Sequence, residues 1–408
     1  MKPRPVGSAS LLALGVNGIV GVGIFFVPAD LARRAPGMGS VAVFAATGLA
    51  LAPVALCFAV LGRRYHVDGG PVVYARAAFG ELASFLVGWV TYVSAVASAA
   101  AVVSGLTGSL LPAAGPAVLR VAAAAVLSLL ALLAAAGIVL SARAWTTLTV
   151  LKLLPLGALI VAFARAAPSP PPPTGGSSFS LGAGLVAMFA LQGFEVVPVI
   201  AGHVRSPARA LPLATLGSLG LAALLYVALQ TICVRSLPGL AASRAPLADA
   251  AAVLGGPALA GAVATGTTVS ALGIAFAMLV TTPRYLSTLA EGGRSFLGLE
   301  AMTARGVPAR ALLVTWALVA LLLQSGSRAE LFALSSVAVL LQYGVTASAL
   351  AVLARRRERG LSPRHALLVP PALAVAAVLA AGASLREAAV AGGAILLGLA
   401  LRRAARRA

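Results

Sequence analysis

Two ionisable side chains stand inside long apolar stretches of this chain. Glu195 follows Gln192 and Gly193 in one stretch, and Lys152 stands in another. An ionisable group within a membrane-spanning segment is costly and by default points to function. A carboxyl at that depth suits a group that gains and loses a proton during transport. A buried amine can release its proton, or act as a fixed cation in the place of a bound metal ion.

Each of these side chains also has a structural interpretation. Glu195 could be permanently protonated and hydrogen-bonded to backbone that Gly193 frees. Lys152 could extend to the membrane surface. Phe189, six residues before Glu195, could close over a bound ligand, or it could pack against other helices or face lipid. The sequence leaves these alternatives open.

Glycines interrupt the first apolar stretch, which runs from Leu14 to Pro28. The glycines are Gly15, Gly18, Gly21 and Gly23. Each weakens a helix by roughly 1 kcal/mol relative to alanine, so we expect a break around Gly21 to Gly23. Backbone released at membrane depth must line a cavity or be buried in protein. The freed peptide groups would then hold a ligand, unless the glycines only allow close helix packing.

The composition places these residues in an integral membrane protein. Of the 408 residues, 60% are hydrophobic and 10% are charged, whereas a soluble domain has about 25% charged residues. The net charge of +20 follows topology, because most Lys and Arg fall in the segments expected on the cytoplasmic side. We therefore expect a lipid bilayer and no nucleic acid as partner. Cys57 and Cys233 lie within spans and are expected to pack, and no cofactor or metal is expected.

Segments of about 20 apolar residues cross a bilayer as helices, and the sequence predicts twelve. They are residues 8–32, 39–61, 81–111, 117–140, 144–164, 181–203, 211–235, 250–290, 311–326, 329–353, 366–382 and 387–402. An even count places both ends of the chain on one side. Arginines at the end of the chain mark that side as cytoplasmic. The prediction is a multi-pass protein of the cytoplasmic (inner) membrane.

The two halves of the chain share one feature. The span over 181–203 contains Gln192, Gly193, Pro198 and Gly202, and so is a second interrupted apolar helix. Broken spans at corresponding positions of two halves are typical of inverted-repeat transporters, whose breaks meet near the midplane. We expect a first repeat at 1–165, a Pro-rich external loop at 166–180, a second repeat at 181–354, and two further helices with a basic tail at 355–408.

Four stretches, in order along most of the chain, carry a resemblance to a known family. They are Gly18 to Phe25 with Pro28; Gly69 to Tyr74 with Phe79-Gly80 and Gly88-Trp89; Gln192 to Glu195 with Ser206 to Arg209 and Pro212; and Pro283-Arg284 with Glu291-Gly292. This ordered set resembles the amino acid-polyamine-organocation family of permeases. The resemblance implies an all-α fold with five-plus-five inverted repeats, helices 1 and 6 broken, and two C-terminal helices.

The resemblance also implies roles for individual residues. Backbone at Gly21, Val22 and Gly23 would receive a substrate carboxylate, and the carbonyls of Ile19 and Gln192 would face the amino group. Further roles fall on three side chains: Phe189 as an aromatic gate, Glu195 in proton sensing, and Lys152 where sodium-coupled relatives hold an ion.

The expected function is secondary active transport of an amino acid by alternating access, by proton coupling or by exchange. His203 stands where the family has an acidic residue, which puts an ion pair there in doubt. No further buried acid is evident to receive a cationic side chain, which favours small or neutral amino acids. An amine or polyamine exporter and a non-transporting sensor or scaffold stay open. We find no nucleophile, base or metal constellation for an enzyme. The oligomeric state is left open.

Overall fold

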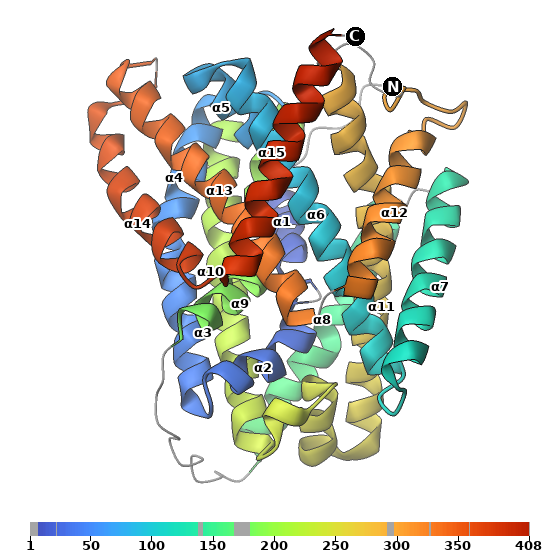
Figure 1. The fold of residues 1–408 in the computed structure, drawn as a ribbon. Helices are drawn as coiled ribbons and strands as arrows, with labels where there is room; N and C mark the ends of the chain where they lie inside the picture. The colour runs from blue at the N-terminus through green and yellow to red at the C-terminus, as the bar shows by residue number, and fades with distance from the viewer. Residues whose placement is uncertain are drawn as a thin grey trace.

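The protein folds as a bundle of long helices (Figure 1). The computed structural model describes residues 7–21, 23–137, 142–166, 180–291, 298–325, 328–358 and 360–407, and no β-strand occurs among them. In a bilayer a helix satisfies all of its backbone groups internally, which is why an apolar chain of this kind folds almost entirely as helices. Most of the expected external loop, residues 167–179, lies outside the described residues.

The described residues of the first half of the chain form eight helices. They are α1 (Ser8–Ile19), α2 (Gly23–Arg34), α3 (Met38–Ala50), α4 (Ala52–Arg64), α5 (Pro71–Phe79), α6 (Glu81–Leu110), α7 (Pro116–Ala135) and α8 (Ala142–Arg165). The second half forms further helices, three of them 3-10 helices. They are α9 (Leu181–Leu191), η1 (Phe194–His203), α10 (Pro207–Ser236), η2 (Leu240–Ala242), α11 (Pro246–Glu291), α12 (Ala309–Ser325), α13 (Arg328–Arg355), η3 (Pro363–Leu368), α14 (Val369–Ala380) and α15 (Leu385–Arg407).

Eight helical segments of the described chain are long and apolar enough to cross a membrane, and the bent pair of α1 and α2 makes a ninth. Three further expected spans correspond to α8, α12 and α15, which are not among these nine. The all-helical, multi-pass character that the sequence predicts is confirmed, and the count of twelve remains a prediction.

Two of the expected spans differ in detail from straight helices. The span expected at 250–290 belongs to α11, which starts at Pro246 and is kinked at Gly256, where φ is +69°. The span expected at 39–61 consists of α3 and α4, which meet at Leu51. The kink at Gly256 precedes Pro257, a residue that cannot continue a helical hydrogen-bond ladder.

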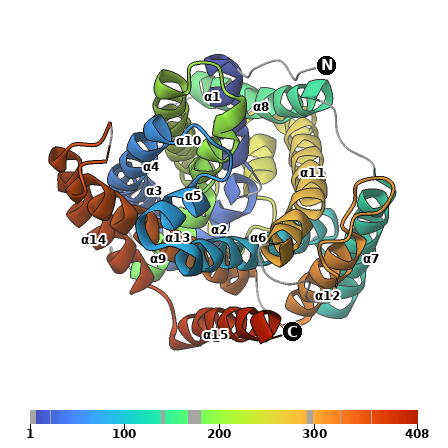
Figure 2. The same ribbon diagram turned by 90° about the horizontal axis from the view of Figure 1, so that it is seen from above.

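The broken helices differ in their position in the bundle. Seen along the bundle, α2, α6, α10 and α11 lie around its centre, α1 lies at the rim beside α8, and α7, α12, α14 and α15 lie at the periphery (Figure 2). Most of the buried apolar side chains form one large core that includes Phe25 and Phe26 of α2, Phe189 of α9 and Phe332 of α13, and a second, smaller cluster packs α1, η1 and α10 together. The peripheral helices expose leucines and valines, as lipid-facing surfaces do.

Candidate functional site

The first break lies between α1 and α2, whose axes differ by 42°. α1 ends at Ile19, and a tight turn follows in which the Gly21 amide donates to the Ile19 carbonyl at 2.6 Å. Val22 lies outside the described residues, and α2 begins at Gly23. The predicted interruption of the first span is therefore confirmed. The carbonyls in the last turn of α1 need partners from elsewhere, because a helix end leaves them without intrahelical donors.

Two side chains from distant helices supply those donors. The Lys152 ammonium of α8 is 3% exposed and donates to the Val20 carbonyl at 2.5 Å and to the Asn17 carbonyl at 3.4 Å. The Tyr226 hydroxyl of α10 donates to the Ile19 carbonyl at 2.6 Å. Lys152 thus turns inward to the end of α1 rather than outward to the membrane surface. A cation at this place is favoured by the negative end of the helix dipole.

The second break lies between α9 and η1. α9 ends at Leu191, Gln192 is extended, and Gly193 has φ of +126°, a value that favours glycine. The Glu195 carboxyl then turns back, so that its Oε2 atom accepts the Gly193 amide at 2.8 Å. The same Oε2 atom accepts the Tyr343 hydroxyl of α13 at 2.9 Å. The sequence prediction of a second interrupted helix at Gln192–Gly193 is confirmed.

A cluster of hydroxyls binds the Gln192 side chain. Its Nε2 atom donates to the Ser335 hydroxyl at 3.1 Å and lies 3.4 Å from the Ser98 hydroxyl. These two hydroxyls are 2.7 Å apart, and Ser94 lies 3.1 Å from Ser335. The cluster joins α9 to α6 and α13. The Gln192 Oε1 atom is buried and has no hydrogen-bond partner among the described residues, so this amide retains an acceptor at the break.

The two breaks touch through their backbones. A Cβ atom placed on Gly193 would lie 2.7 Å from the carbonyl carbon and oxygen of Gly18 and 2.9 Å from the Ile19 amide nitrogen. A Cβ atom on Gly23 would lie 2.7 Å from Cα of Ala190. Separations below about 3 Å leave no room for a side chain, so glycine is required at both positions. The two interrupted helices therefore meet at their breaks, with backbone packed against backbone.

Phe189 packs inside the bundle. It is 6% exposed, and its ring stacks on Phe332 of α13 with ring centroids 4.1 Å apart and an interplanar angle of 27°. The lipid-facing alternative for Phe189 does not hold in this structure. Gly21, another predicted site residue, lies next to Ile274 of α11. The Ile274 Cδ1 atom is 3.3 Å from the position that a Cβ on Gly21 would take.

A cavity of about 150 Å³ lies between the first turn of α2, the end of α6 and the first half of α11. Phe25, two residues after Gly23, forms part of its wall together with Leu247 and Thr267. Leu247 is close to the connection between α10 and α11, at the end of the bundle away from α5 (Figure 1). The cavity therefore leaves open space next to Phe25, near the start of α2.

At the opposite end, the α4–α5 loop holds the end of η1. Asp68 Oδ1 accepts the Gly202 amide at 2.9 Å, and Asp68 Oδ2 lies 3.0 Å from His203 Nδ1. The Gly69 amide donates to the Val199 carbonyl at 2.8 Å. The presence of His203 in place of an acidic residue puts an ion pair here in doubt. Asp68 supplies the acid instead, and lies close enough to pair with a protonated His203.

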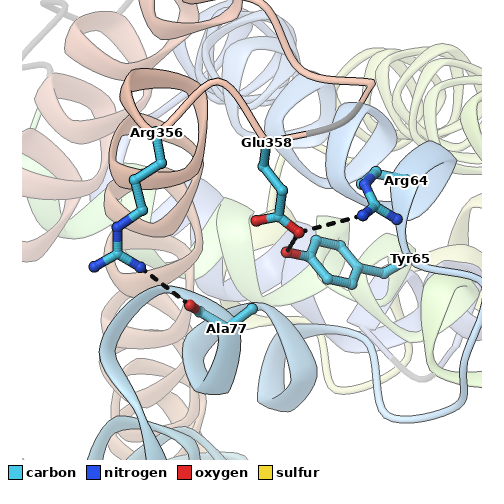
Figure 3. Close-up of polar contacts among 5 residues, drawn as sticks. All are labelled: Arg64, Tyr65, Ala77, Arg356 and Glu358. Carbon is cyan, nitrogen blue, oxygen red and sulfur yellow. Dashed lines mark hydrogen bonds and ion pairs between the residues drawn. The ribbon is translucent and has the colours of Figure 1, made fainter.

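A second polar contact at that end joins α4 to the α13–η3 connection (Figure 3). Glu358 Oε1 accepts the Tyr65 hydroxyl at 2.9 Å and the Arg64 guanidinium at 3.3 Å. Arg356 donates to the Ala77 carbonyl at 3.4 Å. Burial, together with the hydrogen bond to Glu358, raises the pKa of the Tyr65 hydroxyl, so this hydroxyl stays a donor.

Sequence reasoning missed the side chains that hold the predicted residues in place. Tyr226 and Tyr343 bind the two breaks, and Ser98 and Ser335 bind Gln192. One signal was available: the chain has 6 Tyr, and a tyrosine within an apolar span needs a partner for its hydroxyl. Which partner it has depends on how the helices pack, which spacing along the chain does not show.

Comparisons with known proteins agree with this architecture. The family model described as amino acid permease matches residues 7–386. An uncharacterised transporter of Mycobacterium tuberculosis (strain ATCC 25618 / H37Rv) is 33% identical over 412 residues, covering 97% of this chain and 89% of that protein. The methylthioribose transporter of Bacillus subtilis (strain 168) is 26% identical over 314 residues, covering 71% and 68%.

A branched-chain amino acid permease of Bacillus subtilis (strain 168) is 30% identical over 260 residues, covering 58% of this chain and 55% of that protein. Among solved structures, a manganese transporter from Eremococcus coleocola superposes with a TM-score of 0.62 at 16% identity, covering 96% of this chain and 94% of that one. This likeness concerns the fold. Because the family match and the full-length relative extend over nearly the whole sequence, this chain belongs to the amino acid permease family and is a multi-pass membrane transporter, not an enzyme.

Proposed function

We propose that this protein is a secondary active transporter that moves a small or neutral amino acid across the cytoplasmic membrane by alternating access, driven by protons. The observation that carries the proposal is the contact between the two breaks, Gly18–Ile19 against Gly193. Paired broken helices of this kind present amides to an anionic group and carbonyls to a cation, as a zwitterion requires.

The amides at the start of α2 would bind the substrate carboxylate. Gly21 and Gly23 flank Val22 there, and a helix N-terminus favours a negative group. The carbonyls of Ile19 and Gln192 would bind the amino group. The Ile19 carbonyl already accepts the Tyr226 hydroxyl and the Gly21 amide, so a substrate amino group would replace one of these two donors.

The buried carboxylates favour a substrate that carries no positive charge beyond its amino group. Among the buried side chains of the described residues, the carboxylates are those of Glu195 and Asp30. Asp30 pairs with Arg33 of its own helix, and Glu195 binds Tyr343 and the Gly193 amide. A polyamine would need a free acid at the site. The relative named as a branched-chain amino acid permease also supports a neutral substrate.

Proton coupling would rest on Glu195 and Lys152. Each binds one break: Glu195 the Gly193 amide of the second, and Lys152 the carbonyls at the end of the first. A change of charge at either residue changes the hydrogen bonds that shape the site. Proton binding and substrate binding would thereby be linked, because each alters the affinity for the other.

The membrane topology completes the proposal. Twelve spans with a five-plus-five inverted repeat, bounded as 1–165 and 181–354, would place both chain ends in the cytoplasm. The exposed arginines of the α4–α5 region and Arg403 near the C-terminal end of α15 would then lie on the cytoplasmic side. Asp68, His203 and Glu358 would form contacts that close this side.

Label counterflow tests the proposal. Purified protein in liposomes is loaded with an unlabelled amino acid, and entry of the same labelled amino acid is followed over time. We expect transient accumulation for one or more small or neutral amino acids and none for putrescine or spermidine. Counterflow with the amines alone would contradict the assignment. Protein-free liposomes provide the baseline.

A further inference from the structure

We propose that Tyr343 is a positioning residue for proton coupling: its hydroxyl ties the charge state of Glu195 to helix α13. This inference rests on the proposed function, since it names the partner through which Glu195 acts. Tyr343 is 1% exposed and Glu195 is 8% exposed. Their contact, at 2.9 Å, joins residues 148 positions apart in the chain.

One oxygen of Glu195 carries both hydrogen bonds. Its Oε2 atom accepts the Gly193 amide at 2.8 Å as well as the Tyr343 hydroxyl. An ionised carboxylate accepts both, and such charge-assisted bonds are about twice as strong as neutral ones. A protonated carboxyl has a donor of its own and fewer acceptor sites. The Gly193 amide can only donate, so protonation of Glu195 must weaken the hydrogen bond from Tyr343 or reverse its direction.

Helix α13 is bound to the second break at two points that differ in their response to protons. Ser335 binds the Gln192 amide at 3.1 Å, and neither group titrates. Tyr343 binds Glu195, which does titrate. Protonation of Glu195 therefore loosens one of the two attachments and leaves the other. Helix α13 therefore responds to the protonation of Glu195 through Tyr343, whereas its attachment through Ser335 does not depend on protonation.

Aromatic packing fixes the Tyr343 ring independently of its hydroxyl. The ring lies 5.6 Å from Phe58 of α4 and 5.3 Å from Phe194 of η1, measured between centroids. Replacement by phenylalanine keeps these contacts and removes the hydroxyl alone. The Tyr285 hydroxyl of α11 also interacts electrostatically with Glu195, and it is unchanged in that variant.

Tyr343→Phe is compared with Tyr226→Phe. Tyr226 is also fully buried, and its hydroxyl also binds a broken helix, but its acceptor is the Ile19 carbonyl, which does not titrate. The measurement is the initial rate of amino acid uptake into liposomes at a series of external pH values, with KM and maximal rate determined at each. A structural defect changes the rate at every pH, whereas a positioning role moves the midpoint of the pH profile.

We expect Tyr343→Phe to move that midpoint to higher pH by about one unit, because a hydrogen bond to a charged group that favours the ionised form is lost. Tyr226→Phe changes KM and leaves the midpoint in place. Glu195→Asp, which shortens the side chain and separates it from Tyr343, shifts the midpoint in the same direction and serves if Tyr343→Phe does not fold. In the Glu195→Gln background, Tyr343→Phe has no further effect on the pH profile.

Two results overturn the inference in distinguishable ways. If the wild-type rate changes with pH and Tyr343→Phe and Glu195→Asp keep its midpoint, Tyr343 has no part in coupling and the proposed function stands. If the wild-type rate is the same at every pH, the coupling assigned to Glu195 fails and the role of Tyr343 fails with it.

Discussion

The α-carbon of Gly193 faces the peptide carbonyl of Gly18 so closely that a Cβ at position 193 would lie 2.7 Å from it. This contact brings the interruption of one helix against the interruption of another. It is made by backbone on both sides, so neither residue can move aside as a flexible side chain would. The geometry of the proposed substrate site depends on it.

Gly193→Ala should slow transport strongly. The substitution places a methyl group against Gly18 and imposes a φ of +126° on a residue other than glycine. Backbone strain of about 1–3 kcal/mol corresponds to an uptake rate roughly 5- to 160-fold lower. Gly220→Ala is the control, since Gly220 lies in α10 with nothing within 4 Å of its Cβ position. Normal uptake by Gly193→Ala would show that the breaks are not in contact during transport.

Lys152→Met should impair both stability and transport. The ammonium is the donor to the Val20 and Asn17 carbonyls, which would be left buried without it. Leaving buried acceptors unsatisfied costs about 1–3 kcal/mol, so we expect a lower melting temperature and slow uptake. Arg165→Met, an exposed change in the same helix, should leave both unchanged. An unaltered melting temperature for Lys152→Met would mean that the ammonium does not hold α1.

Phe189 and Phe332 should be energetically coupled. Their stacked rings join α9 to α13 beside the second break, and such pairs contribute about 0.5–1.5 kcal/mol beyond the area they bury. A double-mutant cycle with Phe189→Leu and Phe332→Leu, read as thermal stability, should give a coupling energy in this range. If Phe189 also closes over the substrate, Phe189→Leu alone raises KM. Additive effects of the two changes on stability would contradict the contact.

Asp68→Ala should loosen the end of η1. Asp68 accepts the Gly202 amide and contacts His203, so its loss removes about 1 kcal/mol of stability. Glu81→Ala is the matched control, because Glu81 pairs with Arg76 on an exposed surface at 3.1 Å, where an ion pair contributes little. Asp68→Asn keeps an acceptor for the Gly202 amide, so its melting temperature should lie between those of Asp68→Ala and Glu81→Ala. Equal melting temperatures for Asp68→Ala and the wild type would contradict the contact.

The interruptions of both helices could be predicted from sequence, because glycine and proline act on local backbone energy. Gly21, Gly23 and Gly193 each stand within or beside a break. The inward position of Lys152 could be suspected from its depth within an apolar stretch, but the sequence left the surface alternative open. Only packing decides between them, and it brings the ammonium to α1, 132 positions away from Val20 in the chain.

The partners of the site residues could not be predicted. Tyr226 meets Ile19 across 207 positions and Tyr343 meets Glu195 across 148. Such pairs depend on helix rotation and on which helices are neighbours, and neither follows from apolar composition. The Asp68 contact with His203 was missed for the same reason. The family resemblance placed an acidic residue at the position of His203 itself. In the structure the acidic partner of His203 is Asp68, which lies in the α4–α5 loop.

The most direct test is accumulation driven by a pH gradient. Liposomes containing the wild-type protein are made alkaline inside, and the concentration of a labelled neutral amino acid that shows counterflow is measured on both sides. The account predicts that the internal concentration rises above the external one, that a protonophore abolishes this rise, and that Glu195→Gln reaches equal concentrations without accumulation. Equal concentrations with the wild-type protein, or undiminished accumulation by Glu195→Gln, would contradict it.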